Sequence, residues 1–123
     1  MISETMGIEV LKGKIIRKII GCKNDDELIF MVDIDEAYRM WHRQDCCENV
    51  TIYDICGDLD WLIDSPILVA EERTNLNENP IREFDDYFTW TFYELATLKG
   101  SVTIRWYGTS NGYYSESVDF ERI

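Results

Sequence analysis

Two runs of alternating apolar and polar residues near the carboxyl end most strongly limit what this chain can fold into. They span residues 101–107 and 113–120, and Asn111 and Gly112 lie between them. Alternation with a period of two is typical of a strand with one buried face, and Asn-Gly is a strong turn signal between such runs. The pattern therefore predicts a β-hairpin and favours a fold that is mainly β.

Further strand patterns fill the rest of the chain. Three runs rich in β-branched and apolar residues are separated by short acidic turns, which predicts an antiparallel meander over residues 14–23, 27–33 and 37–42. Shorter strands are expected at residues 50–53 and 67–73. The polar stretch that follows, with its asparagines and a proline, is typical of a long mobile loop (residues 74–86).

The longest alternation begins at residue 87 and continues to a turn at Lys99-Gly100. It places Phe88, Trp90 and Phe92 on one side of a strand. Together with the predicted hairpin, this strand is expected to form a three-stranded antiparallel meander with one apolar face.

One short helix is predicted between the two halves. Asp58 suits its N-cap, because a carboxylate accepts a hydrogen bond from a free backbone N–H, and Pro66 ends it. The chain has 123 residues, of which 46% are hydrophobic, enough for one core. We therefore expect a single β-rich domain over residues 1–123: an antiparallel sheet, roll or sandwich of about seven strands with one short helix.

The charge balance restricts the partners. There are 24 acidic and 12 basic residues, for a net charge of −12. Such a surface repels nucleic acid, so direct binding of DNA or RNA is not expected. The acidic surface either keeps the protein soluble or binds a basic partner protein. Residues 1–6 lack a secretory signal and no apolar run is long enough for a membrane span, so we expect a cytoplasmic protein with reduced cysteines.

Two groups of residues suggest metal chemistry. The first is His42 with Cys46, Cys47 and Cys56, since imidazole and thiolate bind zinc. Its spacing is poor, because adjacent cysteines in an extended chain point to opposite faces, and buried cysteines packed as small apolar groups are favoured. Catalysis by His42 with a neighbouring cysteine stays open. The second group lacks calcium-loop spacing and is interpreted as a solvated acidic surface (Asp54, Asp58, Asp60 and Asp64).

The predicted hairpin is the best candidate for ligand binding. Its rings suit stacking on nucleobases, its guanidinium suits phosphate or carboxylate, and its turn offers hydroxyl and amide groups. The alternative is that these residues only build the sheet and its turn. The candidate ligand-binding residues are Arg105, Trp106, Tyr107, Ser110, Asn111, Tyr113 and Tyr114.

Several longer stretches resemble a family of small uncharacterised phage, prophage and bacterial proteins. The similar segments are His42–Glu48 with the letters HRQDCCE, Asp54–Leu59 with DICGDL, Ser65–Leu68, Thr89–Tyr93, and Lys99–Glu116 with VTIRWYGTSNGYYSE. The resemblance covers most of the chain from about Lys12 onward. It implies no known activity and no cofactor. It does imply a context, since small acidic phage proteins often act in host takeover or counter-defence.

Three functions follow as expectations. The first is a non-enzymatic counter-defence protein of the host cytosol that sequesters a small nucleotide-derived immune signal, with Arg105 on phosphate, helped by Arg39 or Arg43. Such proteins often form homo-oligomers. The second is an acidic inhibitor of a nucleic-acid enzyme, as anti-CRISPR proteins are. The third is a metal-dependent enzyme that uses His42 and the cysteines.

Overall fold

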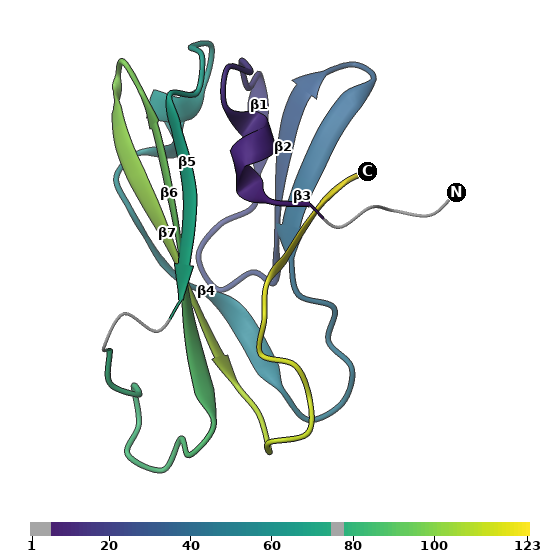
Figure 1. Cartoon of the computed structure of the whole chain (residues 1–123), viewed down its shortest axis with the longest axis vertical. Coiled ribbons are helices and arrows are strands. Elements are labelled where there is room, and N and C mark those ends of the chain that lie inside the picture. The colour runs from purple at the N-terminus through teal and green to yellow at the C-terminus, as the bar shows by residue number, and fades with distance from the viewer. Residues whose placement is uncertain (1–5, 75–77) are drawn as a thin grey trace.

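The computed structural model describes residues 6–74 and 78–123. In this part of the chain, eight strands form two antiparallel four-stranded sheets that face each other (Figure 1). The first sheet has the order β1 (Lys18–Ile20), β2 (Glu27–Asp33), β3 (Glu36–Trp41) and β8 (Asp119–Arg122). The second has the order β4 (Asn49–Cys56), β7 (Gly100–Thr109), β6 (Phe88–Thr97) and β5 (Val69–Thr74). The predicted mainly β class is confirmed, and the architecture is a sandwich.

Two single turns of 3₁₀ helix accompany the sheets, η1 (Ile8–Leu11) and η2 (Leu59–Leu62). The Asp58 carboxylate accepts a hydrogen bond from the Asp60 N–H at 2.9 Å, which confirms the predicted N-cap of η2. Within the described ranges, no helix combines the length and the apolar character that a membrane span requires.

The core lies between the two sheets. Strand alternation sends one row of large side chains from each strand into this space, and most of them have no exposed surface. Trp106 of β7 is the largest of them, and its indole N–H lies 3.1 Å from the Met40 sulfur on β3. The residues that carry most of the core are Leu28, Phe30, Met40, Ile52, Tyr93, Leu95, Ile104, Trp106 and Phe120.

The predicted amino-terminal meander is confirmed, because β1 pairs with β2 and β2 with β3, each antiparallel. The predicted strand at residues 50–53 is present as the longer β4. The predicted turn at Lys99-Gly100 also joins β6 to β7 in register. Residues 75–77 of the predicted loop lie outside the described residues.

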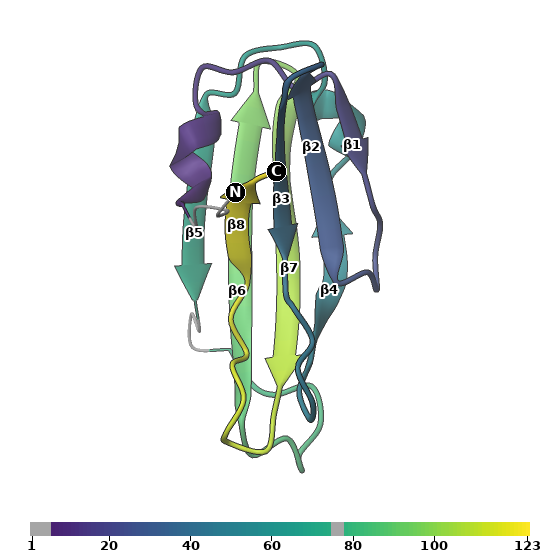
Figure 2. The ribbon, with the colours of Figure 1, turned by 90° about the vertical axis from the view of Figure 1, so that its right-hand side faces the viewer.

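The predicted carboxyl-terminal hairpin is wrong. β7 and β8 lie in different sheets, with β8 beside β3 and β7 behind it (Figure 2). Gly112 does adopt the left-handed conformation expected of it, with φ +94°. The chain therefore bends at this point, but it crosses from one sheet to the other instead of folding back into a hairpin.

Two physical causes prevent the hairpin. Both edges of β7 are already paired, one with β4 and the other with β6, so no edge is left for residues 113–120. In addition, the crossing segment bonds to itself: Ser110 Oγ accepts from the Gly112 N–H, and Ser115 Oγ accepts from the Ser117 N–H. Such local bonds compete with a strand ladder.

The expectation of one apolar face on the carboxyl-terminal strands is also wrong. Tyr93 and Leu95 of β6 point into the core, whereas Trp90 and Phe92 lie on the outer face of the second sheet. There they pack with Tyr107 in a separate buried cluster. Both faces of β6 are therefore apolar, and the loop before β6 covers the outer one.

The two outer edges of the second sheet, β4 and β5, are protected in different ways from pairing with another strand. On β4, the N–H and C=O of Ile52 bond to the backbone of Asp25 and Asn24, at 2.9 and 2.8 Å. Asn24 reaches this position with φ 77°, a conformation that asparagine tolerates better than most residues. At the opposite edge, β5 carries exposed charged side chains, Glu71, Glu72 and Arg73. Charged edges discourage pairing with another strand.

Candidate functional site

The predicted ligand-binding residues fall into three places. Trp106 lies in the core, fully buried. Arg105 and Tyr107 lie on the outer face of the second sheet. The other four belong to the segment that crosses from β7 to β8. At the same end of the sandwich, this segment (110–118) meets the β3–β4 loop (42–48) and the loop before β6 (78–87), as Figure 1 shows. We call these three segments the loop end.

Arg105 is held in an ion pair by its neighbour across the sheet. It lies opposite Asp54 of β4, and its Nε and Nη2 donate to the two carboxylate oxygens at 2.6 and 2.5 Å. Its guanidinium carbon also lies 5.5 Å from the ring centres of both Tyr53 and Trp90. The hydrogen bonds to Asp54 raise the pKa of Arg105, so the guanidinium is always charged. An anionic ligand would have to share the guanidinium with Asp54.

Tyr107 anchors the loop before β6. Its hydroxyl donates to Asp85 Oδ2 at 2.6 Å and accepts from the Ile81 N–H at 3.1 Å. Burial and the hydrogen bond to Asp85 raise the pKa of Tyr107 to about 12. Trp90 extends the attachment, because its indole N–H donates to the Asn79 carbonyl at 2.9 Å. Tyr107, which the sequence suggested as a ligand-binding residue, therefore helps to hold residues 79–85 against the sheet.

Tyr107→Phe should therefore loosen this loop without disturbing the core. The Ile81 N–H and Asp85 lose their common partner, and we expect a loss of about 1 kcal/mol in the free energy of unfolding. Amide hydrogen exchange in residues 78–87 should become faster, while the amides of β7 keep their protection. Phe88→Leu, which trims an adjacent ring and keeps the hydroxyl, is the matched control. Unchanged exchange at Ile81 would contradict the assignment.

The crossing segment is organised by its own polar groups. The Glu116 carboxylate accepts from Ser110 Oγ and, at 2.8 Å, from Thr89 Oγ1 on β6. Asn111 Oδ1 accepts from the Tyr113 N–H at 3.0 Å. These bonds engage Ser110 and Asn111 internally and fix the turn. Tyr114 is half-buried, but the Tyr113 side chain is 92% exposed.

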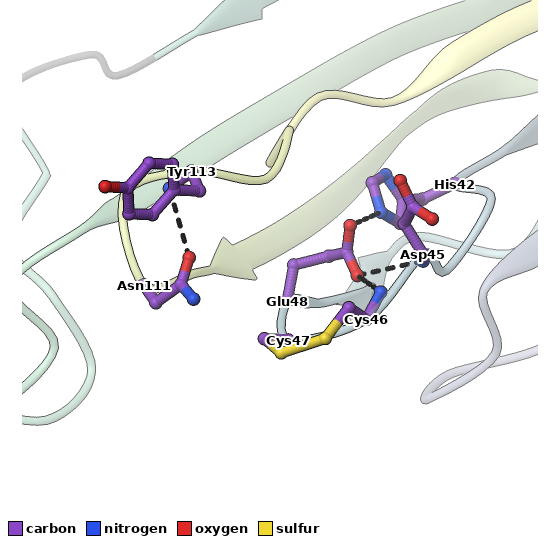
Figure 3. The surroundings of a disulfide bond; sticks show 7 residues. All are labelled: His42, Asp45, Cys46, Cys47, Glu48, Asn111 and Tyr113. Carbon is purple, nitrogen blue, oxygen red and sulfur yellow. Dashed lines mark hydrogen bonds and ion pairs between the residues drawn. A yellow bond between two sulfur atoms is a disulfide. The ribbon is translucent and has the colours of Figure 1, made fainter.

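The β3–β4 loop holds a buried histidine and carboxylate (Figure 3). His42 Nδ1 lies 2.7 Å from the Ser117 carbonyl, which can only accept, so this nitrogen carries a hydrogen. Nε2 faces Glu48 Oε2 at 3.4 Å, without the alignment of a hydrogen bond. Glu48 Oε1 accepts from the N–H groups of Asp45 and Cys46, each at 2.9 Å.

The cysteines differ from the expectation. Cys46 and Cys47 form a disulfide with each other, and both are exposed, as are the free thiols of Cys22 and Cys56. The expectation of buried cysteines is therefore wrong for all four, and the expectation of reduced thiols is wrong for Cys46 and Cys47. The turn of the loop explains the difference, since the chain is not extended there and the two side chains do not point to opposite faces.

The proposed zinc group does not come together. Cys56 ends β4, about 23 Å of extended chain from the start of that strand at the loop end. Among the described residues, no three His, Cys, Asp or Glu side chains are placed to share a metal ion. The acidic group around η2 is also engaged elsewhere, with Asp54 on Arg105 and Asp64 on Arg17. Arg39 is occupied too, by Glu27, Glu121 and the Trp41 ring of the first sheet.

Three exposed rings at the loop end complete the site. Phe84 is 77% exposed and Tyr87 is 55% exposed, and the Tyr87 ring covers Gly112, beside Tyr113. Sequence reasoning missed Phe84 because it lies in a segment interpreted only as a polar loop, and Tyr87 because it was assigned to the start of the next strand. The ring at each end of the sequence Phe-Asp-Asp-Tyr was the available signal.

The same end of the molecule is acidic. The loop end holds seven carboxylates (Asp45, Glu48, Glu78, Glu83, Asp85, Asp86 and Glu116) against two arginines (Arg43 and Arg82). Arg82 is paired with Asp85 at 3.3 Å. Asp45, Glu78, Glu83 and Asp86 are exposed. The rings therefore stand in a field of negative charge.

Comparison with known proteins gives one match. A family model described as a domain of unknown function, DUF7448, matches residues 9–120. No curated protein matches the chain. No solved structure matches it either.

Proposed function

The chain belongs to the DUF7448 family of domains of unknown function, and we propose that it is a binding protein that docks a basic protein through its loop end. The observation that carries the proposal is the group of exposed rings, Phe84, Tyr87 and Tyr113, among unpaired carboxylates. Large aromatic side chains supply most of the energy in protein interfaces, and complementary charge speeds and orients the encounter.

The partner best suited to this surface is a nucleic-acid enzyme with a positively charged groove. Such a groove binds phosphates through lysine and arginine, and exposed carboxylates compete for the same side chains. The net charge of −12 supports this proposal. A phage origin, a place in the host cytosol and a counter-defence role are part of the same proposal.

Sequestration of a nucleotide signal is the competing proposal. The half-buried Arg105 between Tyr53 and Trp90 favours it, since a base can stack on rings while the guanidinium binds phosphate. The contacts of Arg105 with Asp54, and of Tyr107 with Asp85, weigh against it, because each group already holds a carboxylate that would repel an anionic ligand.

The test is a triple variant, Phe84→Ser, Tyr87→Ser and Tyr113→Ser. Proteins retained from a bacterial lysate by the wild type are identified and then measured as purified pairs. The expected result is a basic nucleic-acid enzyme whose binding is at least about thirtyfold weaker with the triple variant. Its affinity should also fall steeply with salt.

A matched control removes exposed apolar side chains elsewhere, Ile34→Ser with Leu98→Ser, which are 91% and 87% exposed in the wild type. This control should bind as the wild type does. Equal loss in both variants would contradict the assignment to the loop end. A thermal shift of several degrees with a cyclic dinucleotide or an ADP-ribose derivative, absent in Arg105→Ala, would favour the competing proposal.

A further inference from the structure

The Cys46–Cys47 disulfide lies at the surface, in the loop that also holds the buried His42 and Glu48. Nothing in the docking proposal uses it. We propose that it is a redox-active site that exchanges with dithiol reductants, and that its state controls the order of the segment crossing from β7 to β8. The proposal does not depend on the identity of a protein partner.

Exposure makes the reaction accessible. Exchange requires a thiolate to approach a disulfide sulfur, and both cysteines are exposed. A stable structural disulfide is usually shielded, whereas disulfides of cytosolic proteins are usually transient and redox-sensing. Cys56 ends β4 far from the loop end, so it does not serve as an alternative partner for this pair.

A continuous series of contacts leads from the disulfide to the crossing segment. The Cys46 N–H donates to Glu48, together with that of Asp45. The second oxygen of Glu48 faces His42, and the opposite ring nitrogen of His42 binds the Ser117 carbonyl. Figure 3 shows the disulfide, Glu48 and His42 side by side, with Asn111 and Tyr113 on the neighbouring segment.

Reduction should weaken this series at its first step. The disulfide closes a ring around the Cys46–Cys47 peptide, directly after the two peptides whose N–H groups donate to Glu48, and two separate thiols leave that turn free to change conformation. A buried carboxylate that loses backbone donors is costly and moves toward water or takes a proton. His42 then loses its contact with Glu48, and its hydrogen bond to the Ser117 carbonyl weakens.

The step is balanced as an ordinary exchange. A thiolate of the reductant attacks one sulfur, forms a mixed disulfide and releases the other cysteine, which takes a proton. The second thiol of the reductant then closes its own disulfide and releases the first cysteine. The site gains two electrons and two protons, and the reductant loses them.

The experiment counts thiols and measures amide exchange in the full chain. Treated with oxidised glutathione, the protein should alkylate at Cys22 and Cys56 only; after dithiothreitol, it should alkylate at all four cysteines. Reduction should speed exchange of the Cys46 amide and of residues 110–118 about tenfold. Amides of β6 in the core should not change.

Two variants separate this effect from a general one. Cys22→Ser with Cys56→Ser should keep the full response, whereas Cys46→Ser with Cys47→Ser should exchange like the reduced protein in either reagent. Four alkylated cysteines after oxidised glutathione would overturn the proposal. So would equal exchange of residues 110–118 in the two states of the wild type, which decides the matter even if the second variant does not fold.

Discussion

Trp106→Ala is expected to remove about 3–5 kcal/mol from the free energy of unfolding. Trp106 is fully buried between the sheets and lies at the centre of β7, which pairs on both sides. Removing the indole leaves a cavity that rigid strands on either side cannot fill. The whole free energy of unfolding of a small domain is about 5–15 kcal/mol, so this variant should be partly unfolded at moderate temperature.

Chemical denaturation followed by circular dichroism measures this loss. Trp106→Phe is the matched control, because it keeps most of the apolar volume and drops only the second ring and the contact with Met40. Its loss should be clearly smaller. If Trp106→Ala cost no more than Tyr107→Phe, the indole would not lie in the core as described.

Glu48→Ala is expected to lower the thermal unfolding midpoint by on the order of 10 °C. The Glu48 side chain is 2% exposed, and its loss leaves the buried His42 ring and the N–H groups of Asp45 and Cys46 without their acceptor. Removing one member of a buried pair costs far more than the pair contributes by itself.

Calorimetry of four proteins tests this pairing: the wild type, Glu48→Ala, His42→Ala and the double variant. We expect the double variant to lose less stability than the two single variants lose together, since the second change removes the buried group that the first change leaves without its partner. Glu83→Ala, which removes an exposed carboxylate of the same loop end, should have little effect. Strict additivity would show that His42 and Glu48 do not interact.

The same carboxylate gives stability a dependence on pH. Burial opposes its ionisation, but the hydrogen bonds from the backbone of Asp45 and Cys46, together with the contact with His42, outweigh burial and lower the pKa of Glu48. Its folded pKa is thus below the unfolded one, so its contribution is complete above the ordinary pKa of glutamate and is lost as the pH falls through the folded pKa. Glu48→Ala should therefore lose less stability in acid than the wild type does.

The local parts of the fold were predictable, and the long-range pairings were not. Alternation located the strands, and short acidic turns joined β1, β2 and β3 correctly. The failure at residues 113–120 arose because β4, some fifty residues earlier, already occupies the edge of β7 that a hairpin needs. No pattern within residues 101–120 shows that another strand already pairs with this edge.

In the candidate site, too, the local features were predictable and the long-range contacts were not. Alternation along residues 101–107 is enough to put Arg105 on the face opposite Trp106, but the pairing of Arg105 with Asp54 depends on the register between β4 and β7. The role of Glu48 was equally hidden, since the His42 ring that it faces is held by Ser117, seventy-five residues further along the chain. The exposed Phe84 was overlooked because its surroundings in the sequence are polar, and Tyr87 because it was assigned to a strand.

The occupied outer edge of β4 and the charged edge of β5 have a consequence for concentrated solutions. Sandwich proteins polymerise when a bare strand accepts the strand of a neighbouring molecule, and here Asn24, Asp25 and the side chains of β5 obstruct that route. The protein should resist fibril formation even when it is abundant. Substitutions that free Ile52 from Asn24 should be the first to produce insoluble assemblies.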